Sequence, residues 1–308
     1  MAKPADKPLV SVIIATYNSA QTLRLAIQSI LAQDFTNYDV WIIGDACSDD
    51  SEQVVLSFAD GRLHWINLAT NSGSQGIPNN EGIRHAGGDY IAYLGHDDLW
   101  FPWHLSGLVD FMEETGGDLV HPLSAAFDPS GLRFTLGPPS EGKSYEDHFI
   151  YPSCWLHRRR LVDECGYWGD ADKLPRRVDM DFLRRVHLAG KKILFYPRLG
   201  MLKFPSPWWG TYAPGFHPPQ ADFLARMGRD ALELEREILF QAATVLARRI
   251  EPRMPVRQAF RQLLLSMAQR GIRSFGSDNR LLDRLRFIYL QRDARKRRKR
   301  RGLPPRRR

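Results

Sequence analysis

Cysteine is scarce in this sequence. Cys47, Cys154 and Cys165 are the three in 308 residues, and their spacing matches neither a zinc site nor a redox motif. We interpret them as reduced thiols of a cytoplasmic protein.

Long apolar runs are also missing. The residues before the first strand-like run hold no apolar core of a signal peptide, and the most apolar later stretch, 238–247, is too short to cross a bilayer. The sequence therefore predicts a globular protein without a membrane-spanning segment.

Two common nucleotide-binding motifs are absent. No Gly-x-Gly-x-x-Gly follows the first apolar run, which argues against a dinucleotide-binding Rossmann domain. No Gly-x-x-x-x-Gly-Lys-Ser/Thr occurs, which excludes a P-loop NTPase as far as motifs allow. Gly73 and Gly76 follow the third strand-like run, where a tight loop explains them as well as a phosphate contact would.

Acidic residues are almost missing from the C-terminal end of the chain. Positions 291–308 hold eleven Lys and Arg against one Asp, a net charge of +10, so the other residues sum to −2 within the overall +8. Such a run is usually solvated, and its functional interpretation is attraction to anionic lipids at the inner face of the membrane. Because the body is nearly neutral, nucleic-acid binding is a disfavoured alternative that rests on the tail alone.

Apolar runs of strand length alternate with helical spacing in the first hundred residues. The strand-like runs cover 9–15, 40–43, 63–68 and 90–94, with helical patterns between them. This alternation predicts a parallel sheet with right-handed crossovers. From Asp118 onward the pattern loosens.

The second part of the chain carries shorter signals. We expect a strand at 119–123, a hairpin near 128–131, a helix at 179–189 and a strand at 192–196. The segment 205–219 is rich in proline and tryptophan and is typical of an ordered loop, whose aromatic residues either form a lid or pack against helices. Helical spacing then covers 221–249, 256–270 and 280–291.

Polar residues collect where the predicted strands end. They are Thr16 and Asn18 after the first strand, Asp45 after the second, and Asp97 with Asp98 after the fourth. In an open parallel sheet, ligands bind beyond the carboxyl ends of the strands. Converging acids favour a divalent cation, which in turn holds a diphosphate. The alternative is helix capping, which is open for Asp45, Asp49 and Asp50 and is less favoured for the Asp97–Asp98 pair.

Several ordered segments resemble the family 2 inverting glycosyltransferases, which have the GT-A fold. The segments are VSVIIATYN at 10–18, IIGDACSDD at 42–50, PNNEGI at 78–83 and GGDYIAYL at 87–94. The resemblance covers about 9–199 and implies an α/β fold of GT-A type, with a mostly parallel sheet flanked by helices. We divide the chain into a GT-A domain at 1–215, a helical C-terminal extension at 216–290 and a basic tail at 291–308.

The resemblance also implies an activity. It is transfer of a hexose from a nucleoside diphosphate sugar to an acceptor hydroxyl with inversion, in cell-surface glycan biosynthesis. The acceptor is a glycan or a lipid-linked glycan. A cytoplasmic enzyme attached peripherally to the membrane through its basic tail would suit such an acceptor.

At the donor site, the resemblance implies roles for individual residues. Asp45 contacts the base of the sugar nucleotide, with Thr16 and Asn18 in the same pocket. Asp97 takes the place of the second acid of the D-x-D motif and binds Mg²⁺ or Mn²⁺ on the diphosphate, and Asp98 lines the donor site.

Two further acids are implied in catalysis. Asp179 matches the family's base, and Asp181 is the next candidate. A carboxylate there takes the proton of the attacking hydroxyl. The alternative role for Asp179 is to cap the helix that follows.

Four positions depart from the family pattern. Gly44 stands where Asp is usual, Gly95 replaces the first acid of D-x-D, Asn79 replaces a frequent Arg within the nucleotide-sugar site, and Val178 replaces Glu. Because the core acids are retained, we expect activity. The two glycines motivate an alternative, a degenerate module that binds a nucleotide sugar or glycan without turnover.

Overall fold

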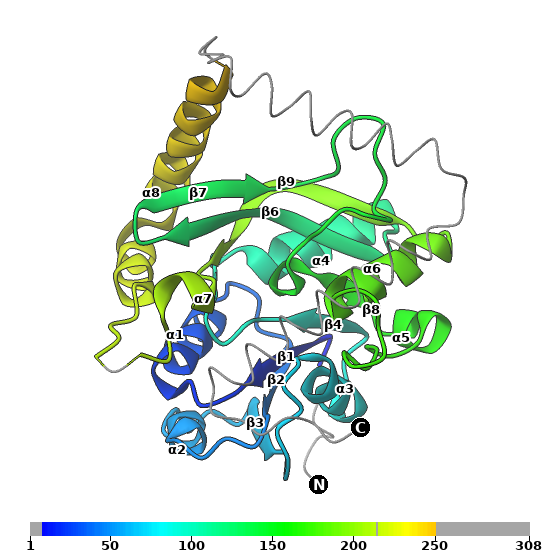
Figure 1. The fold of residues 1–308 in the computed structure, drawn as a ribbon, viewed down its shortest axis with the longest axis vertical. Coiled ribbons are helices and arrows are strands. Elements are labelled where there is room, and N and C mark those ends of the chain that lie inside the picture. Colours follow the sequence, from blue (N-terminus) through cyan, green and yellow to red (C-terminus); the bar gives the residue numbers. More distant parts are fainter. Residues whose placement is uncertain (1–7, 214, 251–308) are drawn as a thin grey trace, which may run out of the picture.

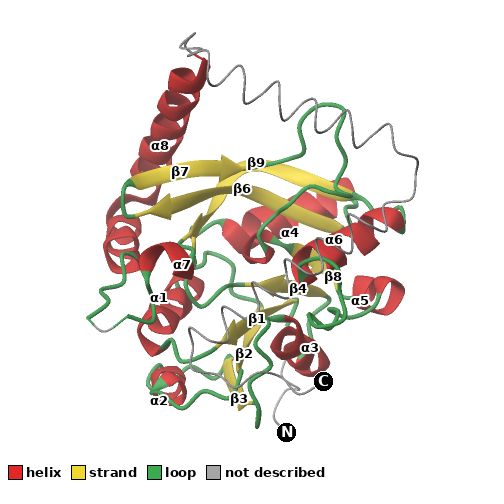
Figure 2. Ribbon diagram, viewed as in Figure 1, coloured by secondary structure: helices red, strands yellow, loops and turns green. Residues whose placement is uncertain are grey.

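The structure, a computed structural model, describes residues 8–213 and 215–250. One mixed sheet has the strand order β3-β2-β1-β4-β8-β6-β9-β5, and β7 pairs with β6 (Figures 1 and 2). The strands are β1 Val10–Thr16, β2 Tyr38–Gly44, β3 Leu63–Asn67, β4 Tyr90–Tyr93, β5 Leu99–Trp100, β6 Leu119–Asp128, β7 Gly131–Leu136, β8 Leu156–Arg158 and β9 Ile193–Lys203. The α-helices are α1 Ala20–Leu31, α2 Ser51–Leu56, α3 Gly76–His85, α4 His104–Thr115, α5 Arg160–Cys165, α6 Val178–Leu188, α7 Ser206–Trp209 and α8 Gln220–Ile250, and a 3₁₀ turn covers Pro152–Cys154.

The first four strands form the parallel half of the sheet. β1 lies between β2 and β4 and is parallel to both, and β3 continues the order beyond β2. Helices α1 and α2 lie on one side of β1–β3 and α3 on the other (Figure 1). This covering explains why the strands are apolar along their whole length: β1 is buried on both faces. The predicted alternation of strands and helices is confirmed here, with bounds shifted by one or two residues.

The second half of the sheet mixes strand directions. β6 runs parallel to β9 but antiparallel to β7 and β8. The predicted hairpin is confirmed, because β6 and β7 join at Asp128 and Gly131. The predicted strands at 119–123 and 192–196 are each the first part of a longer strand. Pro122, Pro197 and Arg198 break the apolar pattern, yet the strands continue through irregular register between β6 and β9.

Two hydrophobic clusters stabilise the fold. The larger one fills the space between the sheet and α1, α3, α4 and α6. The smaller one joins Phe127 and Phe204 to Met227, Leu234 and Ile238 of α8. The predicted helix at 221–249 is thus confirmed as α8, which packs on the end of the β6–β9 ribbon and deviates from helical geometry at Asp230.

The remaining C-terminal predictions concern residues that the structure does not describe. The helices expected at 256–270 and 280–291 and the basic tail at 291–308 lie outside the described residues. Within the described part, no helix is long and apolar enough to cross a membrane. The domain boundaries stay predictions.

Candidate active site

The loops after β2 and β4 meet at the end of β1. The Asp45 N–H donates to Thr16 O (2.8 Å), and the His96 Nδ1–H donates to Ala15 O (3.1 Å). Two successive carbonyls of β1 therefore hold the two acidic loops, one on each side. This places the predicted residues Thr16, Asp45 and Asp97 around one strand end, as parallel β1, β2 and β4 require.

The Asp45 carboxylate accepts three hydrogen bonds from the loop that follows β3. Its Oδ1 accepts from the Ser72 N–H (2.7 Å), and its Oδ2 accepts from Ser72 Oγ (3.0 Å) and the Gly73 N–H (3.1 Å). The carboxylate thus fixes the 71–74 loop and does not cap the helix that follows. Beside it, Thr16 Oγ1 and Asn71 Oδ1 are buried without a hydrogen-bond partner among the described residues. A ligand group there would satisfy both atoms.

Asn18 and Asp49 shape the start of α1. Asn18 has a left-handed backbone (φ 42°), and its Oδ1 accepts from the Ser48 N–H (2.8 Å). Asp49 Oδ2 accepts from the Ala20 N–H (2.9 Å), while Ser19, the N-cap of α1, makes no side-chain cap bond. The capping alternative holds for Asp49, because its carboxylate bonds Ser51 at the start of α2. The same carboxylate also caps α1 through the Ala20 N–H.

Gly44 has a steric reason. A Cβ at this position would lie 2.5 Å from Asn67 Oδ1 and 2.8 Å from the ring of Trp65. The Asn67 amide occupies that space because it bonds both the N–H (2.8 Å) and the carbonyl (2.9 Å) of Cys47. The Asp usual in the family does not fit here, and Asn67 supports the loop in its place.

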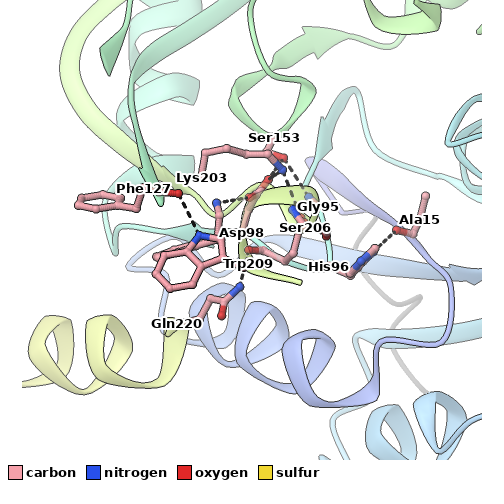
Figure 3. Close-up of polar contacts among 12 residues, drawn as sticks. Ala15, Gly95, His96, Asp98, Phe127, Ser153, Lys203, Ser206, Trp209 and Gln220 are labelled. Carbon is pink, nitrogen blue, oxygen red and sulfur yellow. Dashed lines mark hydrogen bonds and ion pairs between the residues drawn. The ribbon is translucent and has the colours of Figure 1, made fainter. Parts of the chain in front are cut away.

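The second acidic centre consists of Asp97, Asp98 and Lys203. Figure 3 shows Asp98 and Lys203 with Ser153 and Ser206 beside them. Lys203 Nζ lies 3.2 Å from Asp97 Oδ1 and 2.9 Å from Asp98 Oδ2. Strand pairing explains the contact. β5 pairs with β9 through Leu99 and Leu202, so the next step of the antiparallel register sets Asp98 opposite Lys203. The sequence analysis missed Lys203, which lies at the end of an apolar stretch, about a hundred residues after the Asp97–Asp98 pair in the sequence.

Neutral donors complete this centre. Ser206 Oγ donates to Asp97 Oδ2 (2.5 Å), and Ser153 Oγ donates to Asp98 Oδ2 (2.5 Å). The Phe204 N–H donates to Asp98 Oδ1 (3.2 Å). Gln220, the first residue of α8, donates to the carbonyl of Asp97 (2.8 Å). The acidic loop is therefore tied to β9, α7 and α8 at once.

Burial and charge set the acidity of the three groups. Burial raises the pKa of Asp97, but the charges of Lys203 and His96 and the bonds from Ser206 outweigh it and bring the pKa to about 2. Burial raises the pKa of Asp98 to about 6, against the lowering effect of Lys203. Burial lowers the pKa of Lys203, but the two carboxylates more than offset this and hold it above its ordinary value. The ammonium is therefore charged at neutral pH.

The residues around Asp97 do not fit a divalent cation as they are arranged. Among the described residues, no group of three His, Cys, Asp or Glu side chains could hold a metal. Both oxygens of Asp97 are bonded by protein donors, and Lys203 lies where a cation would sit. An ammonium and a divalent ion roughly 4 Å apart repel by about 8 kcal/mol at an effective dielectric constant of about 20. The assignment of Mg²⁺ or Mn²⁺ to Asp97 stays a prediction.

Asp179 and Asp181 lie in the first turn of α6 and differ in their surroundings. Asp179 is 1% exposed, and its Oδ2 pairs with Arg177 Nη2 (2.6 Å). Its Oδ1 accepts from the Met180 N–H (2.8 Å), so it also serves the helix start. Asp181 pairs with Arg185 (2.9 Å), whose guanidinium bonds the carbonyls of residues 165–167. Asp181 thus belongs to a structural network at the C-terminal end of α5.

Two aromatic residues missed by the sequence analysis connect Asp179 with the acidic pair. The guanidinium of Arg177 lies 4.7 Å from the centre of the Phe149 ring, and Phe149 contacts Tyr151 edge-on at 4.8 Å. Lys203 Nζ lies 5.6 Å from the Tyr151 ring. A continuous line of contacts therefore runs from the candidate base to Lys203.

The start of α3 approaches the start of α6. Asn79 is buried there, and a Cβ at Gly76 would lie 3.7 Å from Val178. The neighbouring Asn80, which the sequence analysis missed, bonds both the N–H and the carbonyl of Trp168 (2.9 Å each). These bonds hold Trp168, whose ring stacks on Phe182 at 5.3 Å, and so connect α3 with α6, the helix that carries Asp179.

The aromatic segment after β9 packs on the fold in part. Trp209 Nε1–H donates to Phe127 O (2.9 Å), and Trp209 contacts the smaller hydrophobic cluster. Trp208 and Tyr212 are each 41% exposed. The packing alternative holds for Trp209, and a lid role of its neighbours stays a prediction.

Solved structures define the class of fold. TarS of S. aureus, solved with UDP-GlcNAc, is 22% identical with a TM-score of 0.56 over 63% of this chain and 58% of that chain. The mannosyltransferase PcManGT from Pyrobaculum calidifontis, solved with GDP-Man and Mn²⁺, is 16% identical with a TM-score of 0.53 over 95% and 90%. These similarities confirm the predicted α/β fold of GT-A type.

Residues 11–166, half of the chain, match the family model of glycosyl transferase family 2. The chain belongs to this family, as the sequence motifs predicted.

Curated relatives agree. An uncharacterized glycosyltransferase of Rickettsia bellii is 38% identical over 216 residues, 64% of this chain and 29% of its own length. Escherichia coli WfgD, a UDP-Glc:alpha-D-GlcNAc-diphosphoundecaprenol beta-1,3-glucosyltransferase, is 34% identical over 109 residues, 35% of this chain and 42% of its own. The matches span only 29% to 42% of these relatives.

Proposed function

We propose that this chain transfers a hexose from a nucleoside diphosphate sugar to an acceptor hydroxyl with inversion, in glycan biosynthesis. The observation that carries the proposal is the meeting of two carboxylate centres at the end of β1, where Thr16 O and Ala15 O bond the loops that carry them. A nucleoside diphosphate sugar has two polar ends, and this edge offers a site for each.

The nucleoside end belongs to the loop of Asp45 in this proposal. Thr16 and Asn18 flank it, and the buried Thr16 Oγ1 offers a hydrogen bond to the nucleoside. Asn79 at the start of α3 lines the same site. The diphosphate end lies at Asp97 and Asp98. Because a diphosphate is an anion, its binding beside two carboxylates requires a cation there.

Asp179 is the proposed base, with Asp181 as the alternative. Inversion needs an acceptor hydroxyl that attacks the anomeric carbon opposite the leaving diphosphate, and a carboxylate takes its proton as the bond forms. Three observations support Asp179 over Asp181: its burial, its line of contacts to Lys203, and the structural engagement of Asp181 by Arg185.

A lipid-linked glycan is the proposed acceptor. The name of WfgD states such an acceptor for that relative, and a second relative, TuaG of Bacillus subtilis (32% identical over 110 residues, 35% of this chain and 43% of its own), is named for teichuronic acid biosynthesis. A protein that works on lipid-linked glycans from the cytoplasmic side benefits from a basic tail that attracts anionic headgroups.

The test compares Asp179→Asn with wild type. Calorimetry with UDP-, GDP- and dTDP-sugars identifies the donor, and release of nucleoside diphosphate in the presence of candidate acceptors measures turnover. We expect Asp179→Asn to bind the donor with unchanged affinity and to lose about 10²–10⁴-fold in turnover, the usual contribution of a general base.

Asp163→Asn, an exposed acid on α5, is the matched control and should behave as wild type. Loss of turnover in Asp181→Asn but not in Asp179→Asn would transfer the role of base to Asp181. A wild type that binds donor but releases no diphosphate with any acceptor would favour the degenerate binding module.

A further inference from the structure

The cation at the acidic pair is part of the protein chain. Lys203 Nζ lies within 3.2 Å of both Asp97 and Asp98, and its side chain is 16% exposed. Its place follows from the β5–β9 register, so the backbone delivers the ammonium to the two carboxylates. An ammonium has three N–H donors, of which the two carboxylates take two. The third has no acceptor among the described residues, and a ligand could take it.

Gly95 and Lys203 belong to one arrangement. A Cβ at Gly95 would lie 2.7 Å from Asp98 Oδ2, 3.1 Å from Asp97 Oδ1 and 3.2 Å from Ser153 Oγ. The two carboxylates and Ser153 therefore occupy the space in which a side chain at position 95 would begin. As the loop is packed in this structure, it has no room at position 95 for the first acid of the D-x-D motif. The acid that the family usually has at position 95 is absent, and the ammonium of Lys203 lies beside the same carboxylate, Asp98.

We infer that Lys203 is the resident cation of the donor site. Its ammonium, and not a divalent metal, pairs with Asp97 and Asp98 and donates to the diphosphate of the donor. The inference rests on the proposed function and specifies its diphosphate end. Lys203 cancels one carboxylate charge, and the hydroxyls of Ser206 and Ser153 and the Phe204 N–H share the other. Donor binding then needs no added metal.

The first experiment follows Mn²⁺ by electron paramagnetic resonance, with the full chain and either no nucleotide, UDP or GDP. We expect wild type to bind no Mn²⁺ at the acidic pair, and Lys203→Met to bind it, because the carboxylates are then free of their ammonium. Mn²⁺ bound by wild type and lost in Asp97→Asn would overturn the inference. This readout does not depend on any transferase activity.

The second experiment measures donor affinity by calorimetry in EDTA, Mg²⁺ or Mn²⁺. For wild type we expect equal Kd in all three, and for Lys203→Met a loss on the order of a hundredfold in EDTA, as when one partner of a buried charge pair is removed. Lys203→Arg should bind in EDTA, and the exposed Lys173→Met is the matched control.

The outcomes separate the two proposals. If wild type binds the donor only with Mg²⁺ or Mn²⁺, Lys203 is not the cation of the donor site, and the proposed transferase function is unaffected. Wild type that binds no donor in any buffer would contradict the proposed function, and the Mn²⁺ spectra would still decide which cation the acidic pair takes. Should Lys203→Met fail to fold, the wild-type measurements and Lys203→Arg remain decisive.

Discussion

The two carboxylate centres at this sheet edge differ in the donors that the structure gives them. Asp45 accepts hydrogen bonds from two backbone N–H groups and a hydroxyl of one short loop, and these donors are neutral. Asp97 and Asp98 share a buried ammonium that arrives from a distant strand. Neutral donors shape a pocket without competing for cations. A fixed ammonium does compete, and it couples the acidic loop to the second half of the sheet.

The largest effect should come from removing the shared charge. Lys203→Met leaves two buried carboxylates beside each other, and we expect the free energy of unfolding to fall by about 3–5 kcal/mol. Lys203→Met combined with Asp98→Asn should recover part of this loss, because one of the uncompensated charges is removed as well. Urea unfolding of the two variants and of wild type measures both changes. A single variant as stable as wild type would break the comparison.

A smaller effect is expected at the neutral centre. Asp45→Ala removes the acceptors of Ser72 and Gly73, which should cost about 1–3 kcal/mol of unfolding free energy. Faster hydrogen exchange should be confined to the amides of the 71–74 loop. Asp50→Ala is the control, because Asp50 makes no side-chain cap bond to α2 and its loss should be nearly silent. Exchange that also spreads to β9 would show that the two centres are coupled.

A buried group with no counter-charge sharpens the comparison further. Burial lowers the pKa of His104 from 6.5 to about 3, despite its bond to Gly200 O. Between these values the unfolded chain takes up a proton that the folded protein refuses. The contribution of His104 to stability is therefore present above pH 6.5 and is lost as the pH falls toward 3, by about 1.4 kcal/mol per pH unit.

His104→Asn should reduce this slope between pH 6.5 and 5 in urea unfolding. His85→Asn, on the exposed end of α3, should leave the slope as it is in wild type. Equal slopes in wild type and His104→Asn would mean that another group carries the acid sensitivity.

The parallel half of the fold was predictable because its signals are local. Strands buried on both faces appear as continuous apolar runs, and the polar residues at their ends identify one edge of the sheet. Asp45 and Asp97 follow directly from this pattern. The lengths of β6 and β9 do not, because Pro122 and Pro197 interrupt the pattern while irregular register lets the strands continue.

Lys203, Tyr151 and Phe149, which the sequence analysis missed, reach the site through tertiary contacts. Lys203 depends on the antiparallel pairing of a two-residue strand, and no local pattern predicted β5 or the second half of β9. Tyr151 and Phe149 come from the irregular segment before β8. Asp49 caps a helix that precedes it by about thirty residues, whereas the sequence suggested only the helix that follows it.

The packing around Gly95 has a consequence for how this site changes over generations. An acid at position 95 and a lysine at position 203 contend for the same few ångströms beside Asp98. A chain with both an acid at position 95 and Lys203 would be crowded beside Asp98. A chain with neither would leave the charges of Asp97 and Asp98 uncompensated. In homologous sequences, positions 95 and 203 should therefore covary. Glycine at 95 should occur with lysine at 203, and an acid at 95 should occur where the lysine is absent.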